Sequence, residues 1–189
     1  MLKVEVSGKD YEVCEQVSHN MWSNSKTGEW GRGLANSEND PRKVERIGKL
    51  GEMALAKALN KPVDIAYREH GDAQDFILFR TIKIDLKTAT RRPRYNAGLV
   101  KVIEECGLRI PLTKEIYVFG YVEDEKRSLK SAIVVLVGAS LREEIAAKPI
   151  VPAKKGGHKN HEIPYLEMRS MDRFIELYEK FLRTRNLAS

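Results

Sequence analysis

The sequence predicts a single α/β domain in which helices cover both faces of a mixed central β-sheet. Three observations lead to this fold class. A helical pattern near residue 41 precedes several short strand patterns, an apolar strand pattern follows, and an amphipathic helix comes last. A chain of 189 residues with 42% hydrophobic residues is long enough to bury one core. We expect that core at residues 40–140, between an N-terminal strand and a Trp- and Gly-containing loop at 1–39 and a basic loop and helix at 148–189.

The charge balance favours an anionic partner. Lys and Arg number 33 against 27 Asp and Glu, a formal charge of +6, which suits nucleic acid first. No apolar run approaches the roughly 20 residues of a membrane helix, and the first residues alternate as in a strand rather than forming a signal peptide. We therefore expect a cytoplasmic protein with no membrane partner. Cys14 and Cys106 are far apart and predict reduced structural thiols.

The N-terminal 40 residues predict a strand or hairpin followed by a loop. Residues 2–14 alternate in polarity, and residues 19–40 are rich in Asn, Ser and Gly, which are typical loop residues. Trp22 and Trp30 would pin this loop to the core or stack on a nucleic-acid base.

A helix is predicted from Asp40 onward. Asp40 can cap it, Pro41 suits its first turn, and Pro62 prevents its continuation. Glu52 lies at the margin of its apolar stripe, from where the carboxylate could lean over an adjacent sheet. The expected buried stripe consists of Val44, Ile47, Gly51, Ala54, Leu55 and Ala58.

Three short strands are expected after this helix, at residues 62–69, 75–80 and 82–89, with a turn between the first two. The next apolar residues recur at helical spacing and predict a second helix that ends at Gly107. These residues are Leu99, Val102, Ile103 and Cys106.

Two further strands are expected at residues 115–123 and 131–139, and the second is so apolar that both its faces should be buried. Ser140 and Glu143 have the spacing of a capping box that opens a short helix. An exposed basic segment at 149–164 should follow. The last helix is amphipathic, with Met171, Phe174, Leu177, Tyr178 and Phe181 on its apolar side.

The strand "IKIDLKTAT" holds the most informative pattern. Asp85 and Lys87 would point to the same side, about 6.6–7 Å apart along the backbone. Asp75 opens the preceding strand. A two-residue turn at Arg80–Thr81 would turn Asp75 away from Asp85, because a shift of one residue exchanges the faces of a strand. We therefore expect a three-residue connection or a bulge, which would place both carboxylates on one face.

Carboxylates that converge on one point repel each other unless a cation neutralises them. Mg²⁺ prefers oxygen ligands and is held in proteins by one or two carboxylates, water and substrate phosphate. A lysine beside such a metal can orient an attacking water and stabilise charge that develops on a phosphate. Acids, metal and lysine together favour phosphodiester hydrolysis.

The order of these residues resembles the PD-(D/E)XK nuclease superfamily, which has the restriction-endonuclease-like fold. The resemblance covers residues 44–137 and depends on three segments, "GKLGEMALAKAL", "GDAQDFIL" and "IKIDLKTA". It implies an endonuclease rather than an exonuclease, with Mg²⁺ or Mn²⁺ as cofactor and a metal-activated water as nucleophile. One departure is that Gln74 stands where the motif has proline. The resemblance implies that Asp75, Asp85 and the Leu86 carbonyl are metal ligands and that Lys87 is the catalytic lysine. Glu52 would be a further metal ligand or an acid that supports the ligands.

Basic residues beside this strand are candidates for contacts with DNA. The segment "RRPRYN" follows directly, and "AKKGGHKNH" holds a flexible Gly pair between lysines. The alternative for both is a solvated surface loop. His158 and His161 lack cysteine partners and a helical pattern, so we expect no zinc site there. The candidate DNA-binding residues are Arg91, Arg92, Arg94, Lys154, Lys155 and Lys159.

Two alternatives to a nuclease stay open. Alternating charges on a strand are often only its solvated face, and the chain would then be an inactive nuclease-like module that binds nucleic acid or a protein. A structural protein with an incidentally basic surface is the other.

A nuclease that cuts both strands of a duplex would most simply be a homodimer, for which the last helix and the Trp loop are candidate surfaces. With no recognisable helicase or zinc-finger segment, the chain is similar to accessory enzymes of phages and mobile elements.

Overall fold

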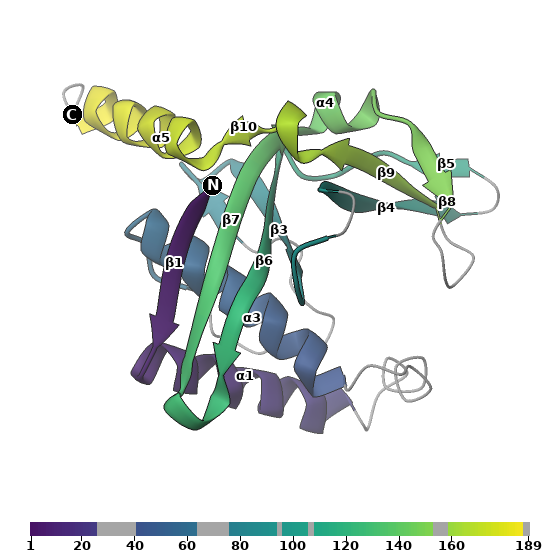
Figure 1. Ribbon diagram of the computed structural model, residues 1–189. Helices are drawn as coiled ribbons and strands as arrows, with labels where there is room; N and C mark the ends of the chain where they lie inside the picture. Colours follow the sequence, from purple (N-terminus) through teal and green to yellow (C-terminus); the bar gives the residue numbers. More distant parts are fainter. Residues whose placement is uncertain (26–40, 64–75, 94–95, 106–107, 153–158, 187–189) are drawn as a thin grey trace.

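A computed structural model describes residues 1–25, 41–63, 76–93, 96–105, 108–152 and 159–186 (Figure 1). The main sheet is formed by β1 (Leu2–Ser7), β2 (Phe76–Leu78), β3 (Ile82–Ala89), β6 (Ile116–Lys126), β7 (Ser131–Leu141) and β10 (Arg169–Ser170). A second sheet is formed by β4 (Ala97–Glu105), β5 (Leu108–Ile110), β8 (Ile150–Pro152) and β9 (Lys159–Pro164). The helices are α1 (Lys9–Ser25), α3 (Pro41–Ala58), α4 (Arg142–Ala146) and α5 (Met171–Asn186), with 3₁₀ turns at Arg127–Leu129 and Tyr165–Glu167.

The main sheet is mixed, as the sequence predicts. Its described strands follow the order β1-β7-β6-β3-β2, and β10 also pairs with β7. Strands β3 and β6 run parallel, whereas the other pairs are antiparallel. Strand β3 therefore lies between β6 and β2, the last described strand at that end of the sheet. The long central strand β7 is buried along almost its whole length, as its apolar sequence predicts.

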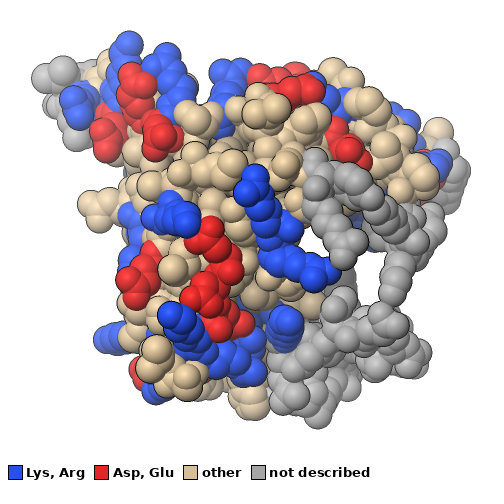
Figure 2. Space-filling model, in the orientation of Figure 1, with Lys and Arg blue, Asp and Glu red and all other residues tan. Residues whose placement is uncertain are grey.

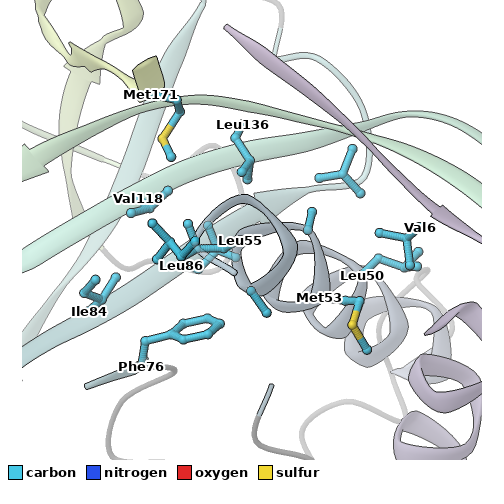
Figure 3. Packing of buried hydrophobic residues seen from close by; sticks show 14 of the residues in the cluster. Val6, Leu50, Met53, Leu55, Phe76, Ile84, Leu86, Val118, Leu136 and Met171 are labelled. Atoms are coloured by element: carbon cyan, nitrogen blue, oxygen red, sulfur yellow. The ribbon is translucent and has the colours of Figure 1, made fainter. Parts of the chain in front are cut away.

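Helix α3 lies across one face of the main sheet, and α1 packs on α3 (Figure 1). Figure 3 shows the resulting core, in which Leu50 and Leu55 of α3 face side chains from β1, β3, β6 and β7. Helix α5 adds Met171, Phe174 and Tyr178 to the same cluster. One large core thus joins three helices to one face of the sheet.

The opposite face of the main sheet is covered mainly by the second sheet, whose order is β5-β4-β9-β8. Tyr117 and Phe119 of β6 pack there with Val100, Ile163 and Ile145 of α4. The α/β class is correct, but the expectation of helical layers on both faces is not, because α4 is the only helix packed on this side among the described residues. The physical reason is that the segment after β3 forms strand β4 of the second sheet, where the spacing of apolar residues had predicted a helix.

Residues 97–105 form strand β4, so the predicted helix there is wrong. Leu99, Lys101 and Ile103 are exposed while Val100 and Val102 are buried, which is the two-residue alternation of a strand. The positions that suggested a helical spacing belong to opposite faces of β4. Cys106 and Gly107 lie outside the described residues.

The N-terminal prediction is also partly wrong. Strand β1 ends at Ser7, and the chain turns at Gly8, whose φ is +57°, into α1, which extends to Ser25. Residues 8–14 are therefore not a second strand, and residues 19–25 are helical instead of a loop. Tyr11, Cys14 and Val17 are buried at helical spacing. Trp22 lies within α1, and Trp30 lies outside the described residues.

The predicted central helix is confirmed as α3, from Pro41 to Ala58. Its buried side is wider than one stripe, because α1 covers a second side of it and buries Leu50 and Met53. Val44, expected to be buried, is 44% exposed.

Two details near the C-terminus differ from expectation. The predicted capping box of Ser140 and Glu143 is shifted by one residue. Helix α4 has Leu141 as its N-cap, and the Leu141 N–H donates to the Glu144 carboxylate. The segment expected to be an exposed basic loop contains β8 and β9, and its Asn160 and His161 are buried. The last helix is confirmed as α5. Within the described ranges, no helix is long and apolar enough to cross a membrane.

Candidate active site on strand β3

Strand β3 is held between a helix and the second sheet. Its even-numbered side faces α3, where Ile84 and Leu86 are buried and Thr88 meets Gly51. Its odd-numbered side therefore points toward the side of the second sheet, and Asp85 and Lys87 are on it. The parallel register sets Asp85 beside Tyr117 of β6. The sequence "IKIDLKTA" thus predicted correctly which side chains of β3 face α3 and which face the other side of the sheet.

Asp85 and Lys87 form an ion pair, with Lys87 Nζ 2.6 Å from Asp85 Oδ2. The Asp85 side chain is 17% exposed and that of Lys87 is 43% exposed. Although the two atoms are close, Oδ2 is buried and makes no hydrogen bond within the described residues, because the ammonium approaches it outside hydrogen-bonding geometry. The pair balances charge but leaves an inward-facing carboxylate oxygen with unused acceptor capacity.

Tyr117 lines the same side of the sheet as Asp85. Its side chain is buried, and burial raises the pKa of the Tyr117 phenol above its ordinary value. The backbone of Lys114 opposes this rise, and the negative charge of Asp85 adds to it. Asp85 therefore lies near enough to Tyr117 for its charge to be felt, in a partly desolvated place on the sheet.

The hairpin before β3 has the connection that the sequence analysis required. Leu78 pairs with Ile82 and Phe76 with Ile84, so three residues, Phe79 to Thr81, join the strands. Phe79 and Arg80 both have positive φ, at 54° and 71°, which closes this tight connection. Asp75 itself lies outside the described residues, so the face to which it points stays a prediction.

Glu52 is buried on α3 but is not shown in contact with Asp85. Its Oε2 accepts a hydrogen bond from Lys49 Nζ at 2.7 Å, and the two side chains are 11% and 8% exposed. The neighbouring Gly51 is the residue that touches β3, and Glu52 is turned about 100° from it around the helix axis. The structure thus brings Asp85 and Lys87 together and leaves Glu52 beside Lys49.

The described residues do not by themselves complete a metal site. Among them, no three His, Cys, Asp or Glu side chains gather closely enough to hold an ion. Asp85 nevertheless fits the ligand role, since its buried Oδ2 makes no hydrogen bond in the described part of the chain and has the Lys87 ammonium, at 2.6 Å, as a neighbouring charge. One carboxylate and one backbone carbonyl would also match the few protein ligands that Mg²⁺ uses.

The candidate DNA-binding residues are spread over two parts of the structure. Arg91 and Arg92 are exposed just after β3, and Arg92 Nε donates to Asn96 at 3.0 Å. Lys159 lies on β9 of the second sheet and is paired with Glu104 at 3.0 Å. Figure 2 shows Lys and Arg mixed with Asp and Glu over much of the face seen, with one basic band near its centre. The remaining candidates, Arg94, Lys154 and Lys155, lie outside the described residues.

The histidine and cysteine residues within the described ranges suggest no further chemistry. His161 is buried with Nδ1 3.2 Å from the Lys148 carbonyl oxygen, and His158 lies outside the described residues. Cys14 is buried in α1, and burial, followed by the charge of Glu52, raises the pKa of its thiol to about 12. A thiol of this kind is unreactive at neutral pH, as the structural role predicted for Cys14 requires.

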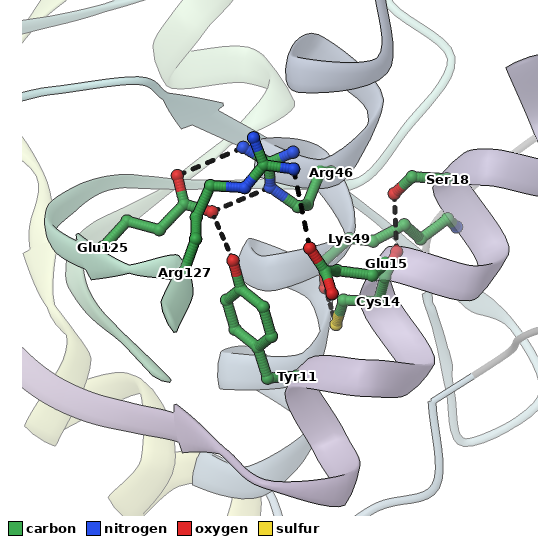
Figure 4. A network of polar contacts seen from close by, with 8 residues as sticks. All are labelled: Tyr11, Cys14, Glu15, Ser18, Arg46, Lys49, Glu125 and Arg127. Carbon is green, nitrogen blue, oxygen red and sulfur yellow. Dashed lines mark hydrogen bonds and ion pairs between the residues drawn. The ribbon is translucent and has the colours of Figure 1, made fainter. Parts of the chain in front are cut away.

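A buried ion-pair network was missed by sequence reasoning. Arg46 of α3 donates to both carboxylate oxygens of Glu125 on β6, at 2.7 and 3.2 Å, and Tyr11 of α1 donates to the same carboxylate at 2.8 Å (Figure 4). Arg127 and Glu15 lie alongside, 3.6 Å apart. Burial, together with the bond to Glu125, raises the pKa of Tyr11 to about 12. The three main partners come from three elements, and nothing local in the sequence announces their contact.

This network is structural, because it lies among α1, α3 and the β6–β7 hairpin, whereas Asp85 and Lys87 lie on β3.

No family model, curated protein or solved structure matches the chain.

Proposed function

We propose that this protein is a metal-dependent deoxyribonuclease of the PD-(D/E)XK type, an endonuclease that hydrolyses phosphodiester bonds with Mg²⁺ or Mn²⁺. The main support is the environment of Asp85, whose buried Oδ2 makes no hydrogen bond in the described structure and lies 2.6 Å from half-exposed Lys87. A buried carboxylate oxygen that is ion-paired but makes no aligned hydrogen bond is stabilised less than one that does. Such an arrangement is reasonable where the oxygen serves a ligand.

The hairpin gives independent support. If the β2–β3 register continues by one residue beyond Phe76 and Ile84, Asp75 pairs with Asp85 and shares its face. Two carboxylates so close would repel each other in the absence of a cation. The proposed ligands are therefore Asp85, Asp75 and the Leu86 carbonyl.

When bound, the metal would neutralise these acids and polarise both water and the scissile phosphate. Lys87 is half exposed, so its ammonium can leave Asp85 and turn toward a phosphate once Asp85 has another cation to balance. It would then orient the attacking water and stabilise negative charge on the phosphate during in-line displacement.

Glu52 has a supporting role in this proposal. Its charge is balanced by Lys49 at 2.7 Å, and its helix is pressed against β3 at Gly51. Glu52 would help to hold the helix in register with the metal-bearing strand. Arg91 and Arg92, exposed directly after the strand, would contact the DNA backbone.

The test is cleavage of labelled duplex, single-stranded and branched DNA with Mg²⁺, Mn²⁺ or EDTA. We expect Asp85→Asn and Lys87→Ala to lower the metal-dependent rate by at least about 100-fold. The chain offers a matched control in Asp124 and Lys126, a second Asp-x-Lys pair, 3.5 Å apart and exposed on β6. Asp124→Asn and Lys126→Ala should leave the rate unchanged.

Two results would contradict the proposal. One is cleavage that persists in both β3 variants, which would indicate a contaminant or another site. The other is DNA binding without cleavage of any substrate and with equal retention by all four variants, which would favour the nucleic-acid-binding module instead.

A further inference from the structure

We infer that the outward face of the second sheet is the interface of a symmetric homodimer of this chain. The face is defined here by Leu99, Lys101 and Ile103 of β4, Leu108 and Ile110 of β5, and Glu162 of β9. It lies on a part of the fold that the proposed nuclease site does not use, and the inference does not rest on nuclease activity.

The strand register shows that these side chains share one face. Leu99 pairs with Glu162 and Ile103 with Ile110, and directly paired residues of antiparallel strands point the same way. The opposite face of β4 is packed on the domain, where Val100 is 3% exposed. A Cβ added to Gly98 would lie 2.3 Å from the ring of Phe119. Gly98 and Val100 on one side of β4 thus pack on the domain, whereas Leu99, Lys101 and Ile103 on its other side are exposed.

The outward face is more apolar than a solvated sheet face should be. Leu99 is 49% exposed, Ile103 53% and Leu108 75%. Single exposed aliphatic side chains are ordinary, but Ile103 pairs with Ile110 and lies diagonally across the hairpin from Leu108, so these three form one apolar cluster, whereas Leu99 lies beyond Lys101 on the same face. An exposed apolar cluster marks an interaction surface. An antiparallel sheet with one solvated face normally places polar residues there.

Two charges on this face indicate that the partner is a second copy. Lys101 and Glu162 form no ion pair with any described residue, although nearby Lys159 and Glu104 do pair, at 3.0 Å, on the other side. Lys101 pairs in register with Asn160, so Glu162 lies diagonally across from it. A two-fold axis through the patch would set each Lys101 against Glu162 of the other copy, twice. The face is therefore complementary to itself in charge as well as in polarity.

The other exposed surfaces fit this role less well. On α5, Leu177 and Phe181 are partly exposed, but Phe181 already stacks 4.1 Å from Phe79. The charges around them are paired within the helix, Arg173 with Glu176 at 2.7 Å among them. A nucleic acid would need a basic surface, whereas the outward face combines aliphatic residues with charged residues of both signs: Lys101, Glu162 and, by its register pairing with Leu108, Glu105.

The experiment is sedimentation over a range of concentrations, with charge exchange. We expect wild type to be dimeric and Lys101→Glu and Glu162→Lys each to weaken dimerisation by at least about 10-fold, because each variant sets like charges together twice. An equimolar mixture of the two variants should restore the dimer, since both contacts of the mixed pair are then between opposite charges. Leu129→Asp is the control. Leu129 is an exposed apolar residue in the turn Arg127–Leu129, outside the second sheet, and its substitution should not change the dimerisation constant.

The mixing step separates this inference from a merely structural role. A folding defect in either variant would lower its melting temperature and would not be cured by adding the other variant. The inference is overturned if wild type is monomeric at its highest soluble concentration, or if it is dimeric and neither single variant weakens the dimer. It is equally overturned if the variants weaken DNA binding with no change of mass.

Discussion

Gly51 of α3 lies directly against Thr88 of β3, so closely that a Cβ at position 51 would be 1.9 Å from Thr88 Oγ1. The same Cβ would lie 3.1 Å from Leu86 Cδ2. This contact presses the helix that bears Glu52 onto the strand that bears Asp85 and Lys87. The glycine is needed here for space, because its place in a regular helix requires no unusual backbone angle.

Substitution of Gly51 by alanine should destabilise the fold. Thr88 Oγ1 and Cβ belong to a short, stiff side chain, so the helix must move away from the strand, which we expect to lower the free energy of unfolding by about 1–3 kcal/mol. Urea denaturation measures this loss. Gly48, three residues earlier in the same helix, has nothing within 4 Å of its added Cβ. Gly48→Ala should therefore raise stability by about 0.5–1 kcal/mol, and equal gains for both variants would refute the close contact.

Glu125 should contribute strongly to stability. Its carboxylate is held by Arg46 and Tyr11, and Arg46 has a side chain only 7% exposed. Glu125→Ala would leave that guanidinium buried without its partner, and we expect a loss of about 3–5 kcal/mol in the free energy of unfolding. Tyr11→Phe removes one hydrogen bond to this charged carboxylate and should cost about 1.5–3 kcal/mol.

The exposed pair of Lys3 and Glu123 provides the comparison for this measurement. Their side chains are 64% and 36% exposed and lie 2.6 Å apart. Glu123→Ala should change stability by less than about 1 kcal/mol, because solvent screens the pair. Losses of similar size at positions 123 and 125 would show that the network is not buried in solution.

Stability should fall at acidic pH through Glu125. Burial alone would raise the pKa of this carboxyl, but the hydrogen bonds from Arg46 and Tyr11 outweigh it and hold the pKa below its ordinary value of 4.5. A group with a lowered pKa in the folded state stabilises the protein above its unfolded pKa, and this contribution is lost as pH falls through the folded value. The gap in denaturation midpoint between wild type and Glu125→Gln should be full at neutral pH and should shrink as pH falls below 4.5, and a constant gap would contradict the assignment.

Metal binding at Asp85 should be visible as stability, apart from any catalysis. A ligand that binds only the folded state raises the free energy of unfolding by about 2.7 kcal/mol at 100 times its Kd. We therefore expect Mn²⁺ or Mg²⁺ to raise the melting temperature of wild type and not of Asp85→Asn. Asp124→Asn, which alters an exposed aspartate of the other Asp-x-Lys pair, should keep the full effect. A metal response that is the same in both variants would move the site away from β3.

Local patterns predicted the elements in which apolar residues are buried and polar residues exposed at a regular period. Helix α3 follows from Pro41 and its apolar spacing, and β3 follows from the alternation that separates Ile84 and Leu86 from Asp85 and Lys87. A three-residue β2–β3 connection or a bulge was also expected, since either would allow Asp75 to share a face with Asp85, and the structure has the three-residue connection. In β4, by contrast, exposed Leu99 and Ile103 broke the rule that apolar residues are buried, and their spacing with Val102 imitated a helix.

The sequence by itself determined the acid and lysine that β3 presents, because side-chain direction along a strand alternates whatever surrounds it. It also determined the class of fold, since the periods of burial are local. Only the tertiary structure decided that Lys49 balances Glu52, that Arg46 meets Glu125, and that a second sheet covers the face opposite α3. The first of these depends on which side of a helix is buried. The others join residues far apart in the chain, and their free energy is gained only once distant elements have packed together.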